Sequence, residues 1–428
     1  MLFSPTGFAV IGASREPSKV GHVVFKNLLK SKVKAYPVNL NAKSILGRQC
    51  YKSVIELKGK VSHAVIAVPA RFVPNVIEEC GLAGVKVAII ISAGFSEAGN
   101  KELEGEVMRV ARQQSIKVIG PNVLGVIIPD LYNASFFEGE IKSGGVSFIS
   151  QSGALGVGVL DSLIGKRGLR SFVSVGNTAD VTITQVLKEV LADKGTKCVI
   201  IYAESLKQGR EFMNTCKDSK KPVFILKAGV SNEGVKASAT HTGSLGGSDV
   251  IYSAAFKQCS AIRVKSLSEL ISKALFFERY GFLGNKALII TNAGGPGILL
   301  TDALAEKGFE LPSLPNNLMQ KFNKELSGVA WSHGNPIDLV GDALAERYAR
   351  VLSIIKNYEF YDFIVLLLTP QAMTQPLLTA KSIVKFKKPI IPCFIGGVKV
   401  KKAISFLQKN NLMAFTEINR LVESLITK

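Results

Sequence analysis

The sequence has few of the residues that build metal, redox and disulfide sites. It contains four histidines, one tryptophan and six cysteines in 428 residues. The cysteines are scattered, and no two of them have the spacing typical of a zinc or dithiol site. We therefore predict no bound metal, and we interpret the cysteines as small core residues of a protein in the reducing cytoplasm.

Long apolar runs are also missing. No run approaches the roughly 18–20 apolar residues that a membrane-spanning helix needs. The start of the chain lacks a basic stretch followed by a long apolar core. We therefore expect neither a membrane span nor a signal peptide.

Acidic residues are scarce relative to basic ones, 33 against 53, and the formal net charge is +20. A lysine-rich solvated surface would explain this charge. So would binding of anionic small molecules together with an acidic partner protein, or binding of nucleic acid. The basic residues form no single tract, which disfavours nucleic acid.

What the sequence does contain is a regular alternation of short β-branched runs and amphipathic segments. Apolar runs such as FAVIGAS, HAVIAVPA and VAIIISAGF are separated by helix-like stretches. This pattern predicts an α/β fold with parallel sheets covered on both faces. We predict three domains, at 1–128, 142–280 and 281–428, with the polar, irregular segment IPDLYNASFFEGEIKSGG as a linker.

A glycine-led loop, GASREPSKVG, follows the first predicted strand at the position of a dinucleotide-binding loop. Ser14 and Pro17 replace the second and third glycines of GxGxxG, and Asn39 stands where NAD-binding proteins carry an acid. Backbone N–H groups can still hold a phosphate, assisted by Ser14, Arg15 and Lys19. We expect a nucleotide-bearing ligand other than NAD; a purely structural turn is the alternative.

Two further turns resemble each other. FISQSGALG (148–156) and IITNAGGPG (289–297) both place a hydroxyl residue, an amide residue and glycine between a strand and a helix. Both helix N-termini are candidate phosphate sites, because their N–H groups and dipoles favour an anion. We interpret the match as an internal duplication; chance similarity of two common turns is the alternative.

His241 lies among small residues, in KASATHTGSLGGSD. Small neighbours allow a ligand to come close, and a neutral imidazole is a good nucleophile toward phosphorus. Glu204 ends an apolar strand at the edge where open α/β sheets bind ligands, so its carboxylate can orient the imidazole. A phosphohistidine is therefore chemically coherent; a solvated histidine and a solvated glutamate are the alternatives.

Together these motifs resemble those of the α subunit of ADP-forming acyl-CoA synthetases, relatives of succinyl-CoA synthetase. The resemblance rests on VIGASREPSKVG, SAGFSE, GPNVLG, SQSGALG, THTGSLGGSD, TNAGGPG and NPIDLVGDA, in this order along nearly the whole chain. It implies an N-terminal Rossmann-like CoA-binding domain followed by two flavodoxin-like domains. It also implies the reaction acyl-CoA + ADP + phosphate ⇌ carboxylic acid + CoA + ATP, through an acyl phosphate and a phosphohistidine.

The resemblance further implies roles for individual residues. His241 would be phosphorylated and Glu204 would pair with it, so both are candidate catalytic residues. Phosphate would bind at Ser152, Gly153, Gly294, Gly295 and Gly297. CoA would bind at Gly12, Ala13, Ser14, Lys19, Val38, Asn39, Lys43, Val68, Pro69 and Asn122.

The sequence departs from the family pattern at three loops. It has VNLN where the family has VNPK, GPNV where the family has GPNC, and GNTAD where the family has GNKAD. The lysine of the first loop is therefore lost or replaced by Lys43.

No ATP-grasp domain is recognisable in the sequence. We therefore expect ADP or ATP with Mg²⁺ on a separate ATP-grasp β subunit, in an α2β2 assembly. A non-catalytic CoA-binding regulator of the same fold and a NAD-dependent oxidoreductase are the alternative functions. The intact HTGS motif with Glu204 argues against the regulator, and the missing glycines and acid argue against the oxidoreductase.

Overall fold

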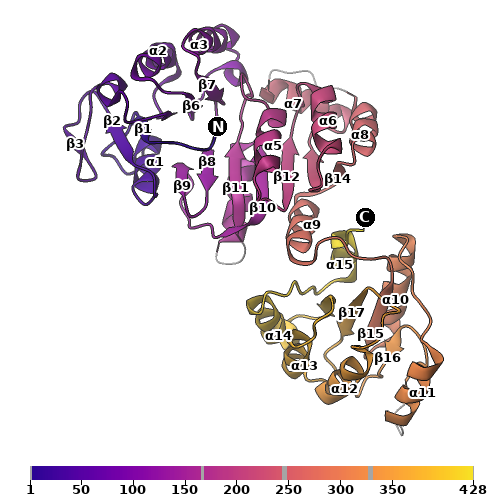
Figure 1. The fold of residues 1–428 in the computed structure, drawn as a ribbon. Helices are drawn as coiled ribbons and strands as arrows, with labels where there is room; N and C mark the ends of the chain where they lie inside the picture. Colours follow the sequence, from indigo (N-terminus) through magenta and orange to yellow (C-terminus); the bar gives the residue numbers. More distant parts are fainter. Residues whose placement is uncertain (1, 165–167, 243–247, 326–330, 428) are drawn as a thin grey trace. The chain divides into compact units, whose positions relative to one another are not determined.

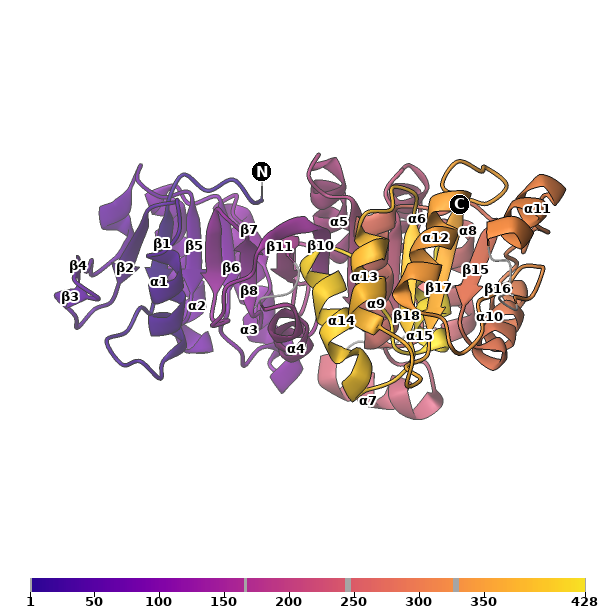
Figure 2. The ribbon, with the colours of Figure 1, turned by 90° about the horizontal axis from the view of Figure 1, so that it is seen from below.

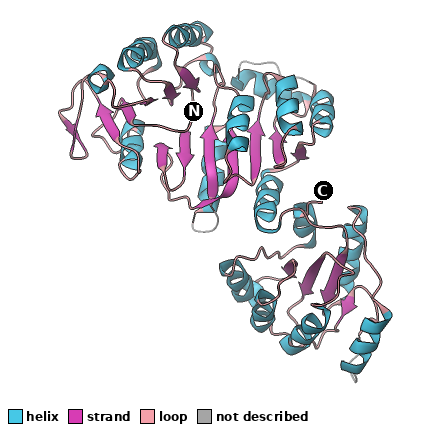
Figure 3. Cartoon of the chain, in the orientation of Figure 1, coloured by secondary structure: helices cyan, strands magenta, loops and turns pink. Residues whose placement is uncertain are grey.

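The computed structural model describes residues 2–164, 168–242, 248–325 and 331–427, with the side chains of 238–242 left out. The chain divides into two compact units, Met1–Ala274 and Leu275–Lys428 (Figure 1). Strands alternate with helices in both units, as Figure 3 shows by colour. The α/β alternation predicted from the sequence is confirmed.

The first unit begins with a parallel five-stranded sheet in the order β2-β1-β5-β6-β7. Its strands are β1 (Phe8–Ile11), β2 (Ala35–Val38), β5 (His63–Ile66), β6 (Val87–Ile90) and β7 (Lys117–Ile119). The connecting helices are α1 (Val20–Leu28), α2 (Val73–Ala83) and α3 (Lys101–Gln113). The strand order reverses between β1 and β5, which is where such sheets bind ligands beyond their carboxyl ends.

Both faces of this sheet are buried, which explains the unbroken apolar strands. Phe8 and Val10 of β1 pack in one core with Phe25 of α1. Ala9 and Ile11 point to the opposite face and join a second core under α2 and α3. Successive side chains of a strand alternate between the faces, so a strand covered by helices on both sides must be apolar throughout.

A seven-stranded sheet follows in the same unit, in the order β14-β13-β12-β10-β11-β8-β9. Its parallel strands are β10 (Ser143–Ser150), β11 (Leu169–Ser174), β12 (Cys198–Ala203), β13 (Val223–Lys227) and β14 (Ile262–Val264). Its helices are α4 (Gly153–Leu163), α5 (Ile183–Ala192), α6 (Gly209–Lys217), α7 (Asn232–Thr242) and α8 (Asp249–Gln258). Helix α9 (Leu267–Tyr280) leads from this unit into the next.

The prediction that IPDLYNASFFEGEIKSGG is only a linker is wrong in one respect, because part of this segment forms a strand of the seven-stranded sheet. β8 (Gly125–Ile128) and β9 (Tyr132–Ser135) form an antiparallel hairpin, and β8 pairs with β11. Asn27 of α1 donates from Nδ2 to the carbonyl oxygens of Ser135 and Phe137, at 2.9 Å each. The hairpin therefore connects the helix layer of the first sheet to the edge of the second.

The second unit holds a four-stranded parallel sheet in the order β16-β15-β17-β18. Its strands are β15 (Ala287–Thr291), β16 (Ile337–Asp338), β17 (Phe363–Leu368) and β18 (Ile390–Phe394). The helices are α10 (Gly294–Glu306), α11 (Asn316–Glu325), α12 (Ala345–Ile355), α13 (Pro376–Val384), α14 (Val398–Lys409) and α15 (Ile418–Ser424). Helices α12, α13 and α14 lie side by side (Figures 1 and 2).

Short elements complete the chain: the β3 (Ser44–Ile45) and β4 (Arg48–Gln49) ribbon and the 3₁₀ turns η1 (Val54–Leu57), η2 (Ala70–Phe72) and η3 (Ser96–Ala98). Among the helices of the described ranges, none combines the length and apolar character that crossing a bilayer requires. The expected cytoplasmic location stays a prediction.

Candidate functional site

The loop after β1 is built around two glycines. Gly12 has φ +88°, and a Cβ there would lie 2.4 Å from the carbonyl oxygen of Ala67. Gly21, in the first turn of α1, packs on this turn so closely that its Cβ would lie 1.9 Å from the carbonyl oxygen of Gly12. Gly21 thus allows the close helix–strand packing that the third glycine of GxGxxG provides. The motif does not point to Gly21, because this loop is longer than the motif's spacing.

Asn39 holds the loops after β1 and β2 together. Its Nδ2 donates to the carbonyl oxygen of Ala13 at 2.8 Å. Its Oδ1 accepts from the N–H groups of Asn41 at 2.8 Å and Ala42 at 3.1 Å. The side chain that stands in place of a ribose-binding acid therefore shapes the loop itself.

The other candidate CoA residues of these loops differ in what they can offer. The side chain of Val38 is buried, so only its backbone can meet a ligand. Lys19 and Lys43 are exposed, and the Lys19 ammonium lies 4.0 Å from the Glu16 carboxylate. Both lysines can therefore be reached from the solvent, and their binding of a CoA phosphate stays a prediction.

The residues expected at the thioester end come together at the carboxyl edge of the first sheet. Ser92, after β6, donates from Oγ to the carbonyl oxygen of Val68 at 2.5 Å. Its own carbonyl oxygen accepts the N–H of Asn122 at 3.1 Å. Asn122 has φ +61°, a conformation that asparagine tolerates better than most residues. Pro69 follows Val68 in the same loop.

The glycine turns of the two units have the same local hydrogen bond. Ser150 donates from Oγ to the carbonyl oxygen of Ser152 at 2.7 Å. Thr291 donates from Oγ1 to the carbonyl oxygen of Ala293 at 3.0 Å. Each hydroxyl therefore fixes the turn that leads from a strand into a glycine-opened helix.

The amide residues of the two turns also correspond. The Oε1 atom of Gln151 accepts the N–H of Glu204 at 2.6 Å and that of Ser205 at 3.0 Å, just past β12. The Oδ1 atom of Asn292 accepts the N–H of Thr369 at 2.9 Å, just past β17. Since β10 pairs with β12 as β15 pairs with β17, the duplication interpretation fits this hydrogen-bond pattern.

The candidate phosphate helices differ at their first residues. Ser152 accepts the N–H of Leu155 with Oγ at 3.2 Å, so the N–H groups before Leu155 are left to face an anion. At Gly294 a Cβ would lie 3.2 Å from a carboxylate oxygen of Asp338. The start of α10 therefore has an acidic neighbour, which would oppose a second anion there. Gly295 and Gly297 belong to the same first turn.

Glu204 is buried at the end of β12 and lies 3.5 Å from the hydroxyl of Tyr202. Lys227 ends the neighbouring strand β13 and is buried too, with its ammonium 4.7 Å from the centre of the Tyr252 ring. Burial lowers the pKa of Lys227, while the carboxylates of Asp249 and Glu204 oppose this shift. The sequence signal for Lys227 is a single lysine at the end of an apolar strand.

His241 is the penultimate residue of α7, and its side chain lies outside the described residues, as do residues 243–247. Its expected pairing with Glu204 therefore stays a prediction. The chain is next described at Ser248, and Asp249 opens α8. Asp249 forms a bidentate ion pair with Arg263 of β14, with N–O distances of 2.5 and 3.0 Å. This pair fixes the chain shortly after His241.

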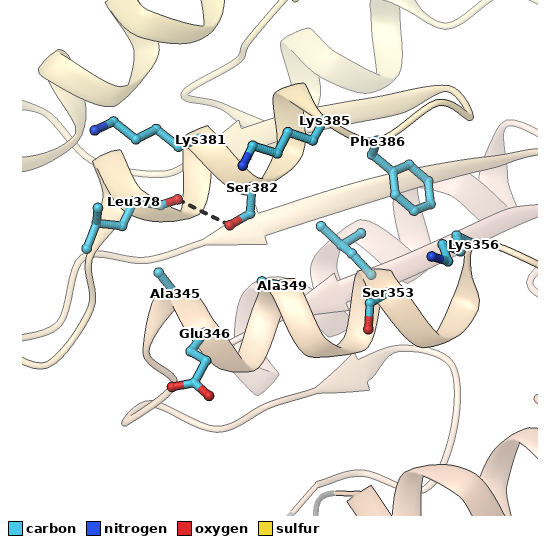
Figure 4. A pocket seen from close by; sticks show the side chains of 11 residues that line it. Ala345, Glu346, Ala349, Ser353, Lys356, Leu378, Lys381, Ser382, Lys385 and Phe386 are labelled. Carbon is cyan, nitrogen blue, oxygen red and sulfur yellow. Dashed lines mark hydrogen bonds between the residues drawn. The ribbon is translucent and has the colours of Figure 1, made fainter.

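A hollow of about 490 Å³ lies elsewhere, between α12 and α13. Figure 4 shows Leu378, Lys381, Ser382 and Lys385 opposite Ala345, Ala349 and Ser353. The Ser382 hydroxyl donates to the Leu378 carbonyl oxygen at 3.3 Å, within its own helix. The hollow's lining includes none of the candidate site residues that the structure describes. Within the described ranges, no group of three or more His, Cys, Asp or Glu side chains could hold a metal.

Comparison with known proteins identifies the family. Three domain models match: a CoA binding domain over 6–129, a succinyl-CoA ligase like flavodoxin domain over 143–277 and a ligase-CoA domain over 287–425. The α subunit of acetate–CoA ligase [ADP-forming] I from Pyrococcus furiosus is 38% identical, covering 99% of this chain and 96% of its own. The chain belongs to the family of ADP-forming acetate–CoA ligase α subunits.

Further similar proteins agree with this assignment. The acetate–CoA ligase [ADP-forming] of Methanocaldococcus jannaschii is 41% identical over 98% of this chain, which spans 61% of that protein's length. The dinucleotide forming acetyl-coenzyme A synthetase 1 of Ca. Korarchaeum cryptofilum, solved with phosphate and ADP, superposes with a TM-score of 0.94. It is 36% identical, and 99% of this chain and 94% of that chain are covered. The predicted fold, a CoA-binding domain followed by two ligase-type α/β domains, is confirmed.

Proposed function

We propose that the chain is the α subunit of an ADP-forming acyl-CoA synthetase that converts acyl-CoA, ADP and phosphate to a carboxylic acid, CoA and ATP. The observation that carries the proposal is the buried Glu204. Gln151, the residue just before the N-cap of α4, accepts the backbone N–H of Glu204 at the sheet edge. The adjacent strand β13 leads to helix α7, which contains His241. A regulator without catalysis would have no need for this arrangement.

The proposed reaction has three steps. Phosphate attacks the thioester carbonyl, and the CoA thiolate leaves, which forms an acyl phosphate. The imidazole of His241 then attacks phosphorus and releases the carboxylate. The phosphohistidine finally transfers its phosphoryl group to ADP, and the imidazole is regenerated.

In this reaction Glu204 accepts a hydrogen bond from the imidazole N–H, fixes its tautomer and stabilises the positive charge that develops on attack. The N–H groups at Ser152–Gly153 hold the phosphoryl oxygens with help from the helix dipole. Gly294, Gly295 and Gly297 are proposed to offer the same N–H groups in the second unit, where the Asp338 carboxylate beside Gly294 makes phosphate binding weaker.

CoA is proposed to bind across the carboxyl edge of the first sheet. Gly12, Ala13 and Ser14 would receive its phosphates at the start of α1, with Lys19 and Lys43 as cationic partners. Val38 and Asn39 would line the nucleotide end, and Val68, Pro69 and Asn122 the thioester end. The hydrogen bonds through Ser92 support this, because they gather the thioester loops at one edge.

We further propose that the nucleotide, with Mg²⁺, binds on an ATP-grasp β subunit and that the assembly is α2β2. Three similar proteins are named as α subunits. None of the three domain models that match this chain is an ATP-grasp domain. Phosphohistidine would then carry the phosphoryl group from the CoA site to the partner's nucleotide.

The decisive experiment is labelling with [³²P]phosphate in the presence of acetyl-CoA. His241→Asn should abolish the acid-labile label. His333→Asn is the matched control, because His333 has φ +56°, which asparagine accepts, and lies against Trp331. Undiminished labelling of His241→Asn would overturn the proposed role of His241, because another residue would then carry the phosphoryl group. A wild-type chain that takes up no label would favour the non-catalytic regulator. Co-purification would then identify the β subunit, and a panel of acyl-CoA substrates would define the acid.

A further inference from the structure

Asn177 lies where the loop after β11 meets the first sheet's domain. Its Nδ2 lies 2.6 Å from a carboxylate oxygen of Glu97, 2.8 Å from one of Glu104 and 3.1 Å from the Ser96 hydroxyl. Glu97 and Ser96 belong to η3, and Glu104 belongs to α3. One amide group therefore bridges two carboxylates of the neighbouring domain.

These two carboxylates are held close although they repel each other. Burial alone would raise the pKa of Glu97, but hydrogen bonds from Asn177 and from the Gly94 N–H lower it overall. Glu97 is therefore ionised at neutral pH and can only accept hydrogen bonds. The Lys207 ammonium, which donates to the Thr178 carbonyl oxygen at 2.8 Å, interacts electrostatically with Glu104.

The turn that Asn177 fixes supports the histidine helix. The Glu97 carboxylate accepts hydrogen bonds from the N–H groups of Gly94 at 2.6 Å and Phe95 at 3.2 Å, so it fixes the backbone that leads into η3. Helix α7, which ends one residue after His241, packs against η3. The hydrogen bonds of Asn177 therefore hold η3, the turn that contacts helix α7.

The same loop is joined to the thioester end by its backbone. The Asn177 N–H donates to the carbonyl oxygen of Pro121 at 3.1 Å, and the Ala179 N–H donates to that of Gly120 at 3.1 Å. A Cβ at Gly176 would lie 2.2 Å from the Pro121 carbonyl oxygen, so the two loops are in direct contact. Asn177 thus touches the thioester loop with its backbone and η3 with its side chain.

We propose that Asn177 is a positioning residue that, by bridging Glu97 and Glu104, holds η3 and the histidine helix in register with the thioester loop. This role of Asn177 rests on the proposed function, and it concerns only one of the two phosphoryl transfers of His241. The bridge serves phosphoryl transfer from the acyl phosphate to His241. In the proposed assembly the nucleotide binds on the other subunit, so we expect transfer between His241 and that nucleotide to proceed without the bridge.

Two substitutions isolate the bridge, because both leave the backbone bonds of Asn177 in place. Asn177→Ala removes the donor, and Asn177→Asp keeps the shape but adds a third carboxylate. Asn27→Ala is the matched control. Asn27 also joins the first sheet's domain to the second sheet through two amide hydrogen bonds, but it does so at the β9 edge.

The experiment measures the initial rate of His241 labelling in the complex of the chain with its partner subunit, from two donors. Acetyl-CoA with [³²P]phosphate reports the acyl side, and [γ-³²P]ATP reports the nucleotide side. Asn177→Ala should slow labelling from the acyl side roughly 10- to 100-fold, the size of effect expected from misplaced reactants. Asn177→Asp should slow it further, and labelling from ATP should stay at the wild-type rate in both variants.

Equal losses from both donors, or no loss from either, would overturn the inference. Asn27→Ala should change the two rates together or leave both unchanged, and thermal unfolding reports its structural cost. Labelling from ATP also shows that each Asn177 variant is folded. A wild-type complex labelled from neither donor would contradict the proposed function itself, which separates the two failures.

Discussion

The side-chain oxygen of Gln151 accepts the backbone N–H of Glu204 at 2.6 Å, although the two residues are 53 positions apart. The bond joins the end of β10 to the end of β12, and it fixes the position of the backbone that carries the Glu204 side chain. Its counterpart in the second unit, from Thr369 to Asn292, has no glutamate at its end. The shared turn is therefore a scaffold, and Glu204 distinguishes the unit that carries the histidine.

Replacement of Gln151 by leucine should affect both stability and labelling. The N–H groups of Glu204 and Ser205 would lose their acceptor, and a buried unsatisfied N–H costs about 1–3 kcal/mol. We expect a lower free energy of unfolding in urea and slower labelling of His241. Asn335→Leu is the control, because it removes the acceptor of the Ile289 N–H in the second unit. It should destabilise the chain without slowing labelling; equal labelling by both variants would contradict the role of Gln151.

Gly21→Ala should weaken CoA binding. The added Cβ would lie 1.9 Å from a backbone oxygen, which cannot move aside like a flexible side chain. The start of α1 would be displaced from the loop at Gly12, at a cost of about 1–3 kcal/mol in stability. Calorimetric titration with CoA measures the affinity. Gly105→Ala in α3 is the control, since a Cβ there would meet no described atom within 4 Å apart from its chain neighbours and the nearby backbone of its own helix. If Gly21→Ala bound CoA like wild type, the loop would not be the CoA site.

Arg263→Met should loosen the chain just after the histidine segment. It removes both hydrogen bonds to Asp249, whose side chain is 27% exposed, and we expect a loss of about 1–3 kcal/mol. Chemical denaturation measures this loss, and labelling should slow as well. Arg350→Met breaks an ion pair with Glu346, whose side chain is 79% exposed, so it should cost less than about 0.5 kcal/mol. Similar losses for the two variants would contradict the anchoring role of Arg263.

Stability should fall in mildly acidic solution because of His63. The ring is buried, its Nε2 donates to the carbonyl oxygen of Leu2 at 3.1 Å, and burial lowers its pKa from the ordinary value of 6.5. Below pH 6.5 the unfolded chain binds the proton more readily than the folded chain. The stability is therefore full above pH 6.5 and declines as the pH falls toward the lower folded pKa.

Thermal unfolding between pH 8 and pH 5 tests this expectation. His63→Asn should have a lower melting temperature at every pH but a smaller decline as the solution is acidified. Cys80→Ser, another change at a buried side chain of the same domain, should keep the wild-type slope. An identical slope in wild type and His63→Asn would show that another group causes the pH dependence.

Much of the fold followed from local patterns, because a strand buried on both faces must be apolar at every position. FAVI, HAVI and VAII are such strands, and all lie in the first sheet. The strand β9 was not predicted, because the sequence analysis relied on apolar runs to find strands. YNAS is short and has no apolar run, and it becomes a strand only because β8 pairs with it. Gly21 was missed because its role depends on contact with Gly12, not on motif spacing.

The sequence by itself determined the class of fold, the family and the residue types that chemistry at phosphorus requires, since these are written in short runs and motifs. Tertiary structure alone decided which distant residues meet at a sheet edge. It joins Gln151 to Glu204, and Asn177 to Glu97 and Glu104. Such bonds depend on strand order and on the packing of one domain against another, and neither is encoded in the spacing of residues along the chain.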